Sequence, residues 1–324
     1  IGPGEALEAA EEIKNYDFQK PTGELRYPHW VFYIRSLLEN TYDAQTIYRS
    51  GFSVYTTLDP VLQDQAQEIV REQVDSLQAK HVTNGSLIAI QPSTGEILAM
   101  VGSADFNNKD IQGEINMSII PRQPGSSIKP LTYLAAFEKG WTPATLIWDV
   151  PSEFPPSGDP NDPRDPYKPV NYDGRFHGPV TVRTALANSY NVPAVKTLDF
   201  VGIYDNPDTE VEEGLIAFAR RMGITTLTRN DYGLALTLGG GEVTLLELVR
   251  AYVPFASGGF AVEPYGIIGI RDRRGGILYW RPPTPASRVL KASHAAAMNS
   301  MLRGVVAPGG TGRRAALQGH SCLL

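Results

Sequence analysis

The chain of 324 residues has few of the residues on which several common kinds of site depend. Its one cysteine, Cys322, excludes an intrachain disulfide framework and a zinc site built on cysteines. The five histidines are scattered along the chain at His29, His81, His177, His294 and His320. Because they lack the spacing of metal ligands, we expect neither a metal nor another cofactor.

Long apolar segments and strong charge are missing as well. No run of about 18 apolar residues occurs and no signal peptide opens the chain at Ile1, so we expect this sequence to be part of a longer protein. The net charge of −6 gives no basic field for nucleic acid, which we exclude as a partner. With 42% hydrophobic and 20% charged residues, the composition suits one large globular domain or two.

One short segment pairs a hydroxyl with an amine. Ser126 and Lys129 stand three residues apart, and residues at this spacing share one face of a helix. Pro124-Gly125 breaks the chain before them, and an almost wholly apolar helix is predicted from Leu131 to about Lys139. Burial lowers the pKa of a lysine, and only its neutral amine accepts a proton from serine. The segment therefore predicts a serine nucleophile with a lysine base.

A second polar segment, Ser189-Tyr190-Asn191, follows about sixty residues later between two predicted helices. Its hydroxyl and amide have the chemistry to share the Lys129 amine, relay a proton and hold a substrate carbonyl. Both segments have a plainer interpretation. A Ser-x-x-Lys pair is expected by chance about once in such a chain, and Ser-Tyr-Asn also suits a helix-end cap.

The remaining pattern alternates helices with hairpins, which predicts an α+β fold. Hairpins are expected at 87–101 and 266–280, a strand at 52–58, and an irregular Pro- and Asp-rich stretch at 150–169. Helices are expected at 5–14, near 34–42, from Asp59-Pro60, from Thr181, from Pro193 to Gly202, from Asp208 to Gly223, from Thr244 to Gly258-Gly259, and from a Ser293 cap to about Val305.

The sequence resembles the transpeptidase domain of class A penicillin-binding proteins, the bifunctional murein synthases. That superfamily carries Ser-x-x-Lys, a Ser-Asp-Asn-type element and Lys-Thr-Gly. The resemblance spans about residues 50 to 317 and rests on several segments in the family's order: 54–59, 93–102, 123–130, 171–174, 177–181, 191–196 and 241–247. It implies an antiparallel sheet flanked by helices, with a helical subdomain carrying the Ser-Tyr-Asn loop.

The resemblance also implies roles for individual residues. Ser126 would be acylated by the penultimate D-alanine of a peptidoglycan stem peptide or by a β-lactam, with Lys129 as general base. Ser189 would move a proton toward the leaving group, and Asn191 would bind the substrate backbone. The implied protein is a serine D,D-transpeptidase on the extracytoplasmic face of the bacterial membrane, with other cell-wall synthesis proteins as further partners.

The sequence departs from the family at both ends. No Lys-Thr-Gly follows the segment from Gly310 to Leu317, so we expect the transpeptidase domain to be truncated at its C-terminus. No segment of this sequence resembles the glycosyltransferase domain or the membrane anchor that class A proteins carry before the linker, so we expect only the linker to remain here. We therefore predict a linker at 1–50, a strand and helix packing on the main domain at 51–83, and the transpeptidase domain at 84–324.

Two alternatives stay open at this stage. The first is a non-catalytic domain of the same fold that binds muropeptides or a protein partner without being acylated. The second is a β-lactam-hydrolysing enzyme or a β-lactam sensor. Labelling of Ser126 by penicillin would separate the first from a transpeptidase, and the rate of deacylation would separate the second.

Overall fold

The computed structural model describes residues 2, 25–157, 161, 163–205, 214–283 and 285–316. Its helices are α2 (Pro28–Glu39), α3 (Ala44–Ser50), α4 (Pro60–Ser76), α5 (Lys129–Glu138), α6 (Val182–Ala187), α7 (Asn191–Val201), α8 (Leu215–Arg221), α9 (Leu245–Ala256) and α10 (Ala292–Val306). Short 3₁₀ helices are η1 (Gln78–Lys80), η2 (Gly125–Ile128), η3 (Leu234–Leu238) and η4 (Arg313–Ala315). Among these described segments, no helix is long and apolar enough to cross a lipid bilayer.

The strands form small antiparallel sheets. They are β1 (Ser53–Thr56), β2 (Leu87–Ile90), β3 (Ile97–Val101), β4 (Leu146–Asp149), β5 (Gly178–Thr181), β6 (Phe260–Ala261), β7 (Ile267–Arg271), β8 (Ile277–Trp280) and β9 (Ser287–Arg288). One sheet has the order β1-β7-β8, and the others are the pairs β2–β3, β4–β5 and β6–β9. Both predicted hairpins are confirmed, whereas the pairing of β1 with the distant β7, with Val54 opposite Ile270, has no local signal.

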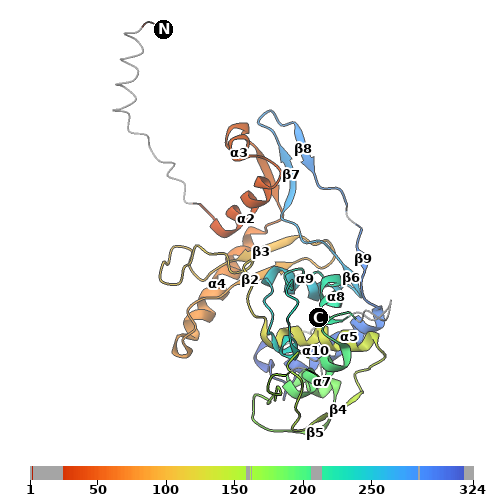
Figure 1. Cartoon of the computed structure of the whole chain (residues 1–324). Coiled ribbons are helices and arrows are strands. Elements are labelled where there is room, and N and C mark those ends of the chain that lie inside the picture. Colours follow the sequence, from red (N-terminus) through yellow and green to blue (C-terminus); the bar gives the residue numbers. More distant parts are fainter. Residues whose placement is uncertain are drawn as a thin grey trace.

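The molecule is extended in Figure 1, with α2, α3 and the β7–β8 hairpin at one end. Helices α5, α7 and α10 gather at the other end with β4 and β5, and the β2–β3 hairpin and α9 lie between the two ends (Figure 1). This mixture of helices and antiparallel strands confirms the predicted α+β class.

The largest core surrounds α5. Every residue of this helix from Lys129 to Phe137 is buried, and its apolar side chains pack against α6, α7, α8 and α10. Each fully buried side chain such as Leu131 or Leu134 contributes about 1.5–3 kcal/mol of hydrophobic stabilisation. The sequence predicted this burial from the apolar residues all round the helix, and the structure confirms it.

Several helix boundaries follow their caps. Asp59 accepts hydrogen bonds from the N–H groups of Val61 and Leu62 at the start of α4, as Asp-Pro predicts. Thr181 caps α6. Thr244 and Glu247 form the predicted capping box of α9.

Other boundaries differ from the predictions. Helix α2 begins at Pro28, earlier than expected, because Trp30, Ile34 and Leu38 repeat at helical spacing and are buried together. Helix α7 begins at Asn191 rather than Pro193. The Ser293 cap was wrong, because α10 begins at Ala292 after Lys291 and has no side-chain cap.

The segment at 150–169 is irregular where it is described, apart from a bridge between Phe154 and Tyr167. The predicted helix at 5–14 and the predicted helix start at Asp208 lie outside the described residues, as do residues 317–324. Of the helix expected up to Gly223, the structure describes α8.

Candidate active site

The serine and lysine of the first polar segment lie on a continuous helical turn. Gly125 has a φ of +58°, a left-handed conformation that glycine adopts without strain, and it opens η2. Ser126 is exposed within η2, and its carbonyl accepts a hydrogen bond from the Lys129 N–H where α5 begins. Because residues i and i+3 eclipse each other in a 3₁₀ helix, this turn aligns the two side chains more closely than an α-helix would.

Contacts from η3 and α9 hold this turn in place. Gly239 ends η3 with a φ of +93°, and a Cβ at this position would clash with the backbone nitrogen of Gly125. The Tyr252 hydroxyl of α9 donates to the Ser127 carbonyl at 2.6 Å, and the Ser127 hydroxyl donates to the Pro124 carbonyl at 2.6 Å. The position of Ser126 is therefore set by η3 and α9 as well as by its own sequence.

Lys129 is fully buried, with 0% of its surface exposed. Its Nζ donates to the Ser189 carbonyl (2.6 Å), the Ser189 hydroxyl (3.1 Å), the Tyr190 carbonyl (3.2 Å) and Asn191 Oδ1 (2.8 Å). Burial lowers the pKa of Lys129 from 10.5 to about 8. Near neutral pH a useful fraction of this amine is therefore neutral.

The Ser189-Tyr190-Asn191 segment turns sharply at its first residue. Ser189 has a φ of +54°, which a residue with a Cβ rarely adopts and which costs about 1–3 kcal/mol. This conformation presents the Ser189 carbonyl and hydroxyl to the same amine. Asn191 then begins α7, and its side-chain Nδ2 donates to the Val170 carbonyl at 2.8 Å.

Among the four residues predicted from the sequence, the structure brings Lys129, Ser189 and Asn191 into direct hydrogen bonding. Ser126 lies one turn before Lys129 on the same helical segment, but the Lys129 amine is directed to the Ser-Tyr-Asn segment instead of the Ser126 hydroxyl.

Three residues behind this cluster were not assigned a role from the sequence: Asp149, Asn171 and His177. The Asn171 amide nitrogen donates to both carboxylate oxygens of Asp149, at 3.0 and 2.8 Å. His177 Nδ1 lies 2.6 Å from the same carboxylate. A sequence signal for Asp149 did exist, because it stands two residues after the buried Ile147 in a strand and so shares its buried face.

In the described ranges there is no cluster of three or more His, Cys, Asp or Glu side chains placed to hold an ion. The polar groups at the candidate site are a hydroxyl-bearing turn, a buried amine and an Asn amide, which together suit nucleophilic acyl transfer.

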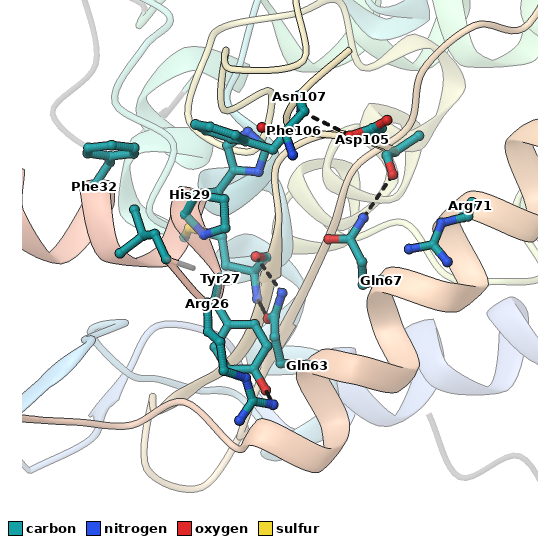
Figure 2. Close-up of a pocket in the computed structure, with 14 residues that line it drawn as sticks. Arg26, Tyr27, His29, Phe32, Gln63, Gln67, Arg71, Asp105, Phe106 and Asn107 are labelled. Atoms are coloured by element: carbon teal, nitrogen blue, oxygen red, sulfur yellow. Dashed lines mark hydrogen bonds between the residues drawn. The ribbon is translucent and has the colours of Figure 1, made fainter. Parts of the chain in front are cut away.

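Two hollows lie outside the cluster. One, of about 770 Å³, lies between α2, α4 and the loop at 104–107 (Figure 2). Its glutamines join α4 to neighbouring backbone: Gln63 exchanges two hydrogen bonds with Met100, and Gln67 donates to the carbonyls of Ser103 and Ala104. The side-chain amides of both glutamines are already hydrogen-bonded to backbone, so we assign no catalytic or binding role to this hollow.

The second hollow, of about 780 Å³, lies beside the serine turn. Its lining includes Arg122, Gln123, Pro124 and Ser127 from the turn and Val243 and Thr244 from the start of α9. It therefore borders the turn that carries Ser126, although Ser126 itself does not line it.

Comparisons with known proteins identify the family of this chain. Residues 85–321 match the family model of the penicillin-binding protein transpeptidase domain. The chain is 34% identical over 262 residues to penicillin-binding protein 2D of Bacillus subtilis, covering 81% of this chain and 35% of that protein. It is 35% identical over 198 residues to penicillin-binding protein 1A of Rickettsia felis, covering 61% of this chain and 23% of that one.

The fold is also shared with solved structures. Penicillin-binding protein 1A of Haemophilus influenzae superposes with a TM-score of 0.77 at 21% identity, over 97% of this chain and 63% of that one. PonA1 of Mycobacterium tuberculosis, solved in complex with penicillin V, gives a TM-score of 0.66 at 19% identity, over 85% and 70% of the two chains. The chain spans about a quarter to a third of the length of the two curated relatives. Its sequence and fold together show that it belongs to the penicillin-binding protein transpeptidase family.

Proposed function

We propose that this chain is the acyl-transferring part of a serine D,D-transpeptidase that cross-links peptidoglycan stem peptides and is acylated by β-lactams. The observation that carries the proposal is the fully buried Lys129 amine, one helical turn from an exposed serine and surrounded by Ser189 and Asn191. A buried amine with a pKa of about 8 suits a general base at neutral pH.

In the first step, the Ser126 hydroxyl oxygen attacks the carbonyl carbon of the penultimate D-alanine. The Lys129 amine accepts the hydroxyl proton, and the positive end of the helical segment that begins at η2 favours the oxyanion. The peptide C–N bond then breaks. The terminal D-alanine leaves with a proton delivered from Lys129 through the Ser189 hydroxyl, and Ser126 remains as an ester.

In the second step, the ester is cleaved by an amine of a neighbouring stem peptide. The amine nitrogen attacks the ester carbonyl carbon and loses a proton to the same Lys129–Ser189 pair. The ester C–O bond breaks, a new amide bond joins the two stem peptides, and Ser126 regains its hydroxyl hydrogen. A β-lactam enters the first step only, because opening its ring leaves the departing nitrogen tethered to the acyl group. Asn191 holds the substrate backbone through its amide in both steps.

The family also suggests the setting. We propose that the protein acts at the extracytoplasmic face of the bacterial membrane, where stem peptides are joined. In the full-length protein a membrane anchor would tether it there, and other cell-wall synthesis proteins would be its partners.

Labelling with a fluorescent penicillin tests the proposal in the complete gene product. The wild type is expected to take up one label, and Ser126→Ala is expected to take up none. Ser127→Ala is a matched control, because it removes a neighbouring hydroxyl that bonds only the Pro124 carbonyl, and it should still be labelled. Equal labelling of Ser126→Ala would refute Ser126 as the nucleophile. Absence of label on the wild type would refute the proposal and favour a non-catalytic binding domain.

A further inference from the structure

The Ser-Tyr-Asn segment is held by a buried polar network that reaches it from β4 and from the loop before β5. Asp149 is 0% exposed and Asn171 is 3% exposed. A buried carboxylate or amide costs free energy unless its hydrogen bonds are made, so a satisfied network here has one favoured arrangement.

Asn171 caps helix α7 from outside its own segment. Its Oδ1 accepts hydrogen bonds from the backbone N–H groups of Asn191 at 2.7 Å and Val192 at 3.3 Å. These are among the first N–H groups of the helix, which have no partner within it. The residue at the N-cap position, Tyr190, supplies no side-chain hydrogen bond. Asn171 therefore fixes where α7 begins, and with it the position of Asn191.

Asp149 fixes which way the Asn171 amide points. The amide nitrogen donates to both oxygens of the Asp149 carboxylate and to the Arg175 carbonyl at 2.7 Å. An amide that donates on this side must present its oxygen on the other side, toward α7. The carboxylate is held in turn by the backbone N–H of His177 at 3.0 Å and by its Nδ1 at 2.6 Å.

His177 connects the same network to the middle residue of the segment. Its ring stacks on Tyr190 with centroids 3.9 Å apart and an interplanar angle of 15°. Its Nε2 lies 3.1 Å from a carboxylate oxygen of Asp173. The buried Asp149 carboxylate therefore helps to position both Tyr190 and Asn191. The Tyr190 carbonyl oxygen and Asn191 Oδ1 accept hydrogen bonds from the Lys129 amine.

We propose that Asn171, oriented by Asp149 and His177, is a positioning residue that places Asn191 and the Lys129 amine for acylation of Ser126. This inference rests on the proposed function. It predicts that disturbing the network slows acylation without abolishing it, because no member of the network touches the reacting atoms. A displacement of about 1 Å in such a site costs about 100-fold in rate.

Four variants of the complete gene product test this inference through the first-order rate constant of acylation at saturating penicillin. Asn171→Asp keeps the shape but places a second carboxylate against Asp149, and Asp149→Leu removes both acceptors of the amide. Each is expected to slow acylation by about 10- to 100-fold, with a smaller change in the apparent Kd for penicillin. Asp149→Asn retains one acceptor but turns an amide NH2 toward the donors of Asn171 or His177, so it should also slow acylation, by less than Asp149→Leu.

Asn188→Ala is the matched control. Its side chain donates only to the Thr184 carbonyl within α6, one residue before the Ser-Tyr-Asn segment, and its loss should leave the rate constant unchanged. A rate constant, unlike the amount of label, does not depend on how much of a sample is folded, so partial unfolding of a variant does not obscure the result. Hydrogen exchange at the Asn191 and Val192 amides should also accelerate in Asn171→Ala, which removes the oxygen that accepts both N–H groups, independently of any acylation.

The inference is overturned if Asn171→Asp and Asp149→Leu acylate at the wild-type rate, or if exchange at those two amides is unchanged. These outcomes leave the proposed function intact. A wild type that is not acylated at all overturns the proposed function instead, and the exchange measurement then still decides whether Asn171 positions the start of α7.

Discussion

The chemistry of Lys129 depends directly on its burial in the core. The apolar surroundings that bury α5 also remove water from its amine, while oxygens of Ser189, Tyr190 and Asn191 favour the charged form. Burial has the larger effect and lowers the pKa of Lys129 to about 8. The spacing of Ser126 and Lys129 and the apolar helix allowed this burial to be predicted from the sequence, because both signals are local.

The pH dependence of acylation follows from this pKa. If the neutral amine is the base, the acylation rate constant should rise about tenfold per pH unit below pH 8 and level off above it. Stopped-flow measurements with a chromogenic β-lactam between pH 6 and 9.5 would show this. A rate constant that is independent of pH from 6 to 8 would exclude Lys129 as the base in its neutral form.

The same amine should make stability depend on pH. The folded pKa of about 8 lies below the ordinary value of 10.5, so the unfolded chain binds more protons between these values and the free energy of unfolding rises with pH there. Relative to Lys129→Met, the wild type should gain about 3 kcal/mol from pH 8 to pH 10.5. Urea unfolding of both proteins across this range measures the difference, and parallel pH profiles would contradict it.

Ser189 combines an unfavourable backbone conformation with a hydroxyl that contacts Lys129. Ser189→Gly and Ser189→Ala both lose the hydroxyl, and both should acylate about 10²- to 10⁴-fold more slowly. Only glycine accepts the φ of +54° without strain, so Ser189→Gly should be about 1 kcal/mol more stable than Ser189→Ala in chemical denaturation. Equal stabilities would show that the turn relaxes in the variants.

At the scale of elements, the serine turn depends on its contact with η3. Gly239→Ala would place a methyl group against the Gly125 backbone, which should destabilise the fold by about 2–4 kcal/mol and slow acylation at least about tenfold. Gly258→Ala is the control, because Gly258 also has a positive φ but no atom within 4 Å of an added Cβ. It should lose about 1–2 kcal/mol with acylation unchanged. If both variants slow acylation equally, backbone strain and not the contact is responsible.

The elements themselves were predictable where their signals were local. Hairpins with turn residues between apolar runs, and helices capped by Asp59, Thr181 and Thr244, lie where the sequence places them. The start of α7 was missed because its cap, Asn171, comes from a loop twenty residues earlier in the chain. Ser293 was misassigned because a serine near a helix start resembles a cap whether or not its side chain bonds the backbone.

At the scale of the whole molecule, the candidate site is assembled from five segments that are distant in the sequence. The turn at 125–129, the Ser-Tyr-Asn segment, the Asp149–Asn171–His177 network and Gly239 meet around one amine and one serine turn. The family and the α+β fold could be identified from the sequence because whole segments occur in the family's order. The buried network could not, because its members are polar residues that become neighbours only in the folded chain.

The central claim is that Ser126 is the nucleophile, and the site of covalent attachment tests it most directly. The complete gene product is treated with penicillin, digested and analysed by mass spectrometry, with fragmentation that separates Ser126 from Ser127. We predict a single penicilloyl adduct on Ser126. An adduct on any other residue, or no adduct on a folded wild-type protein, would contradict the account.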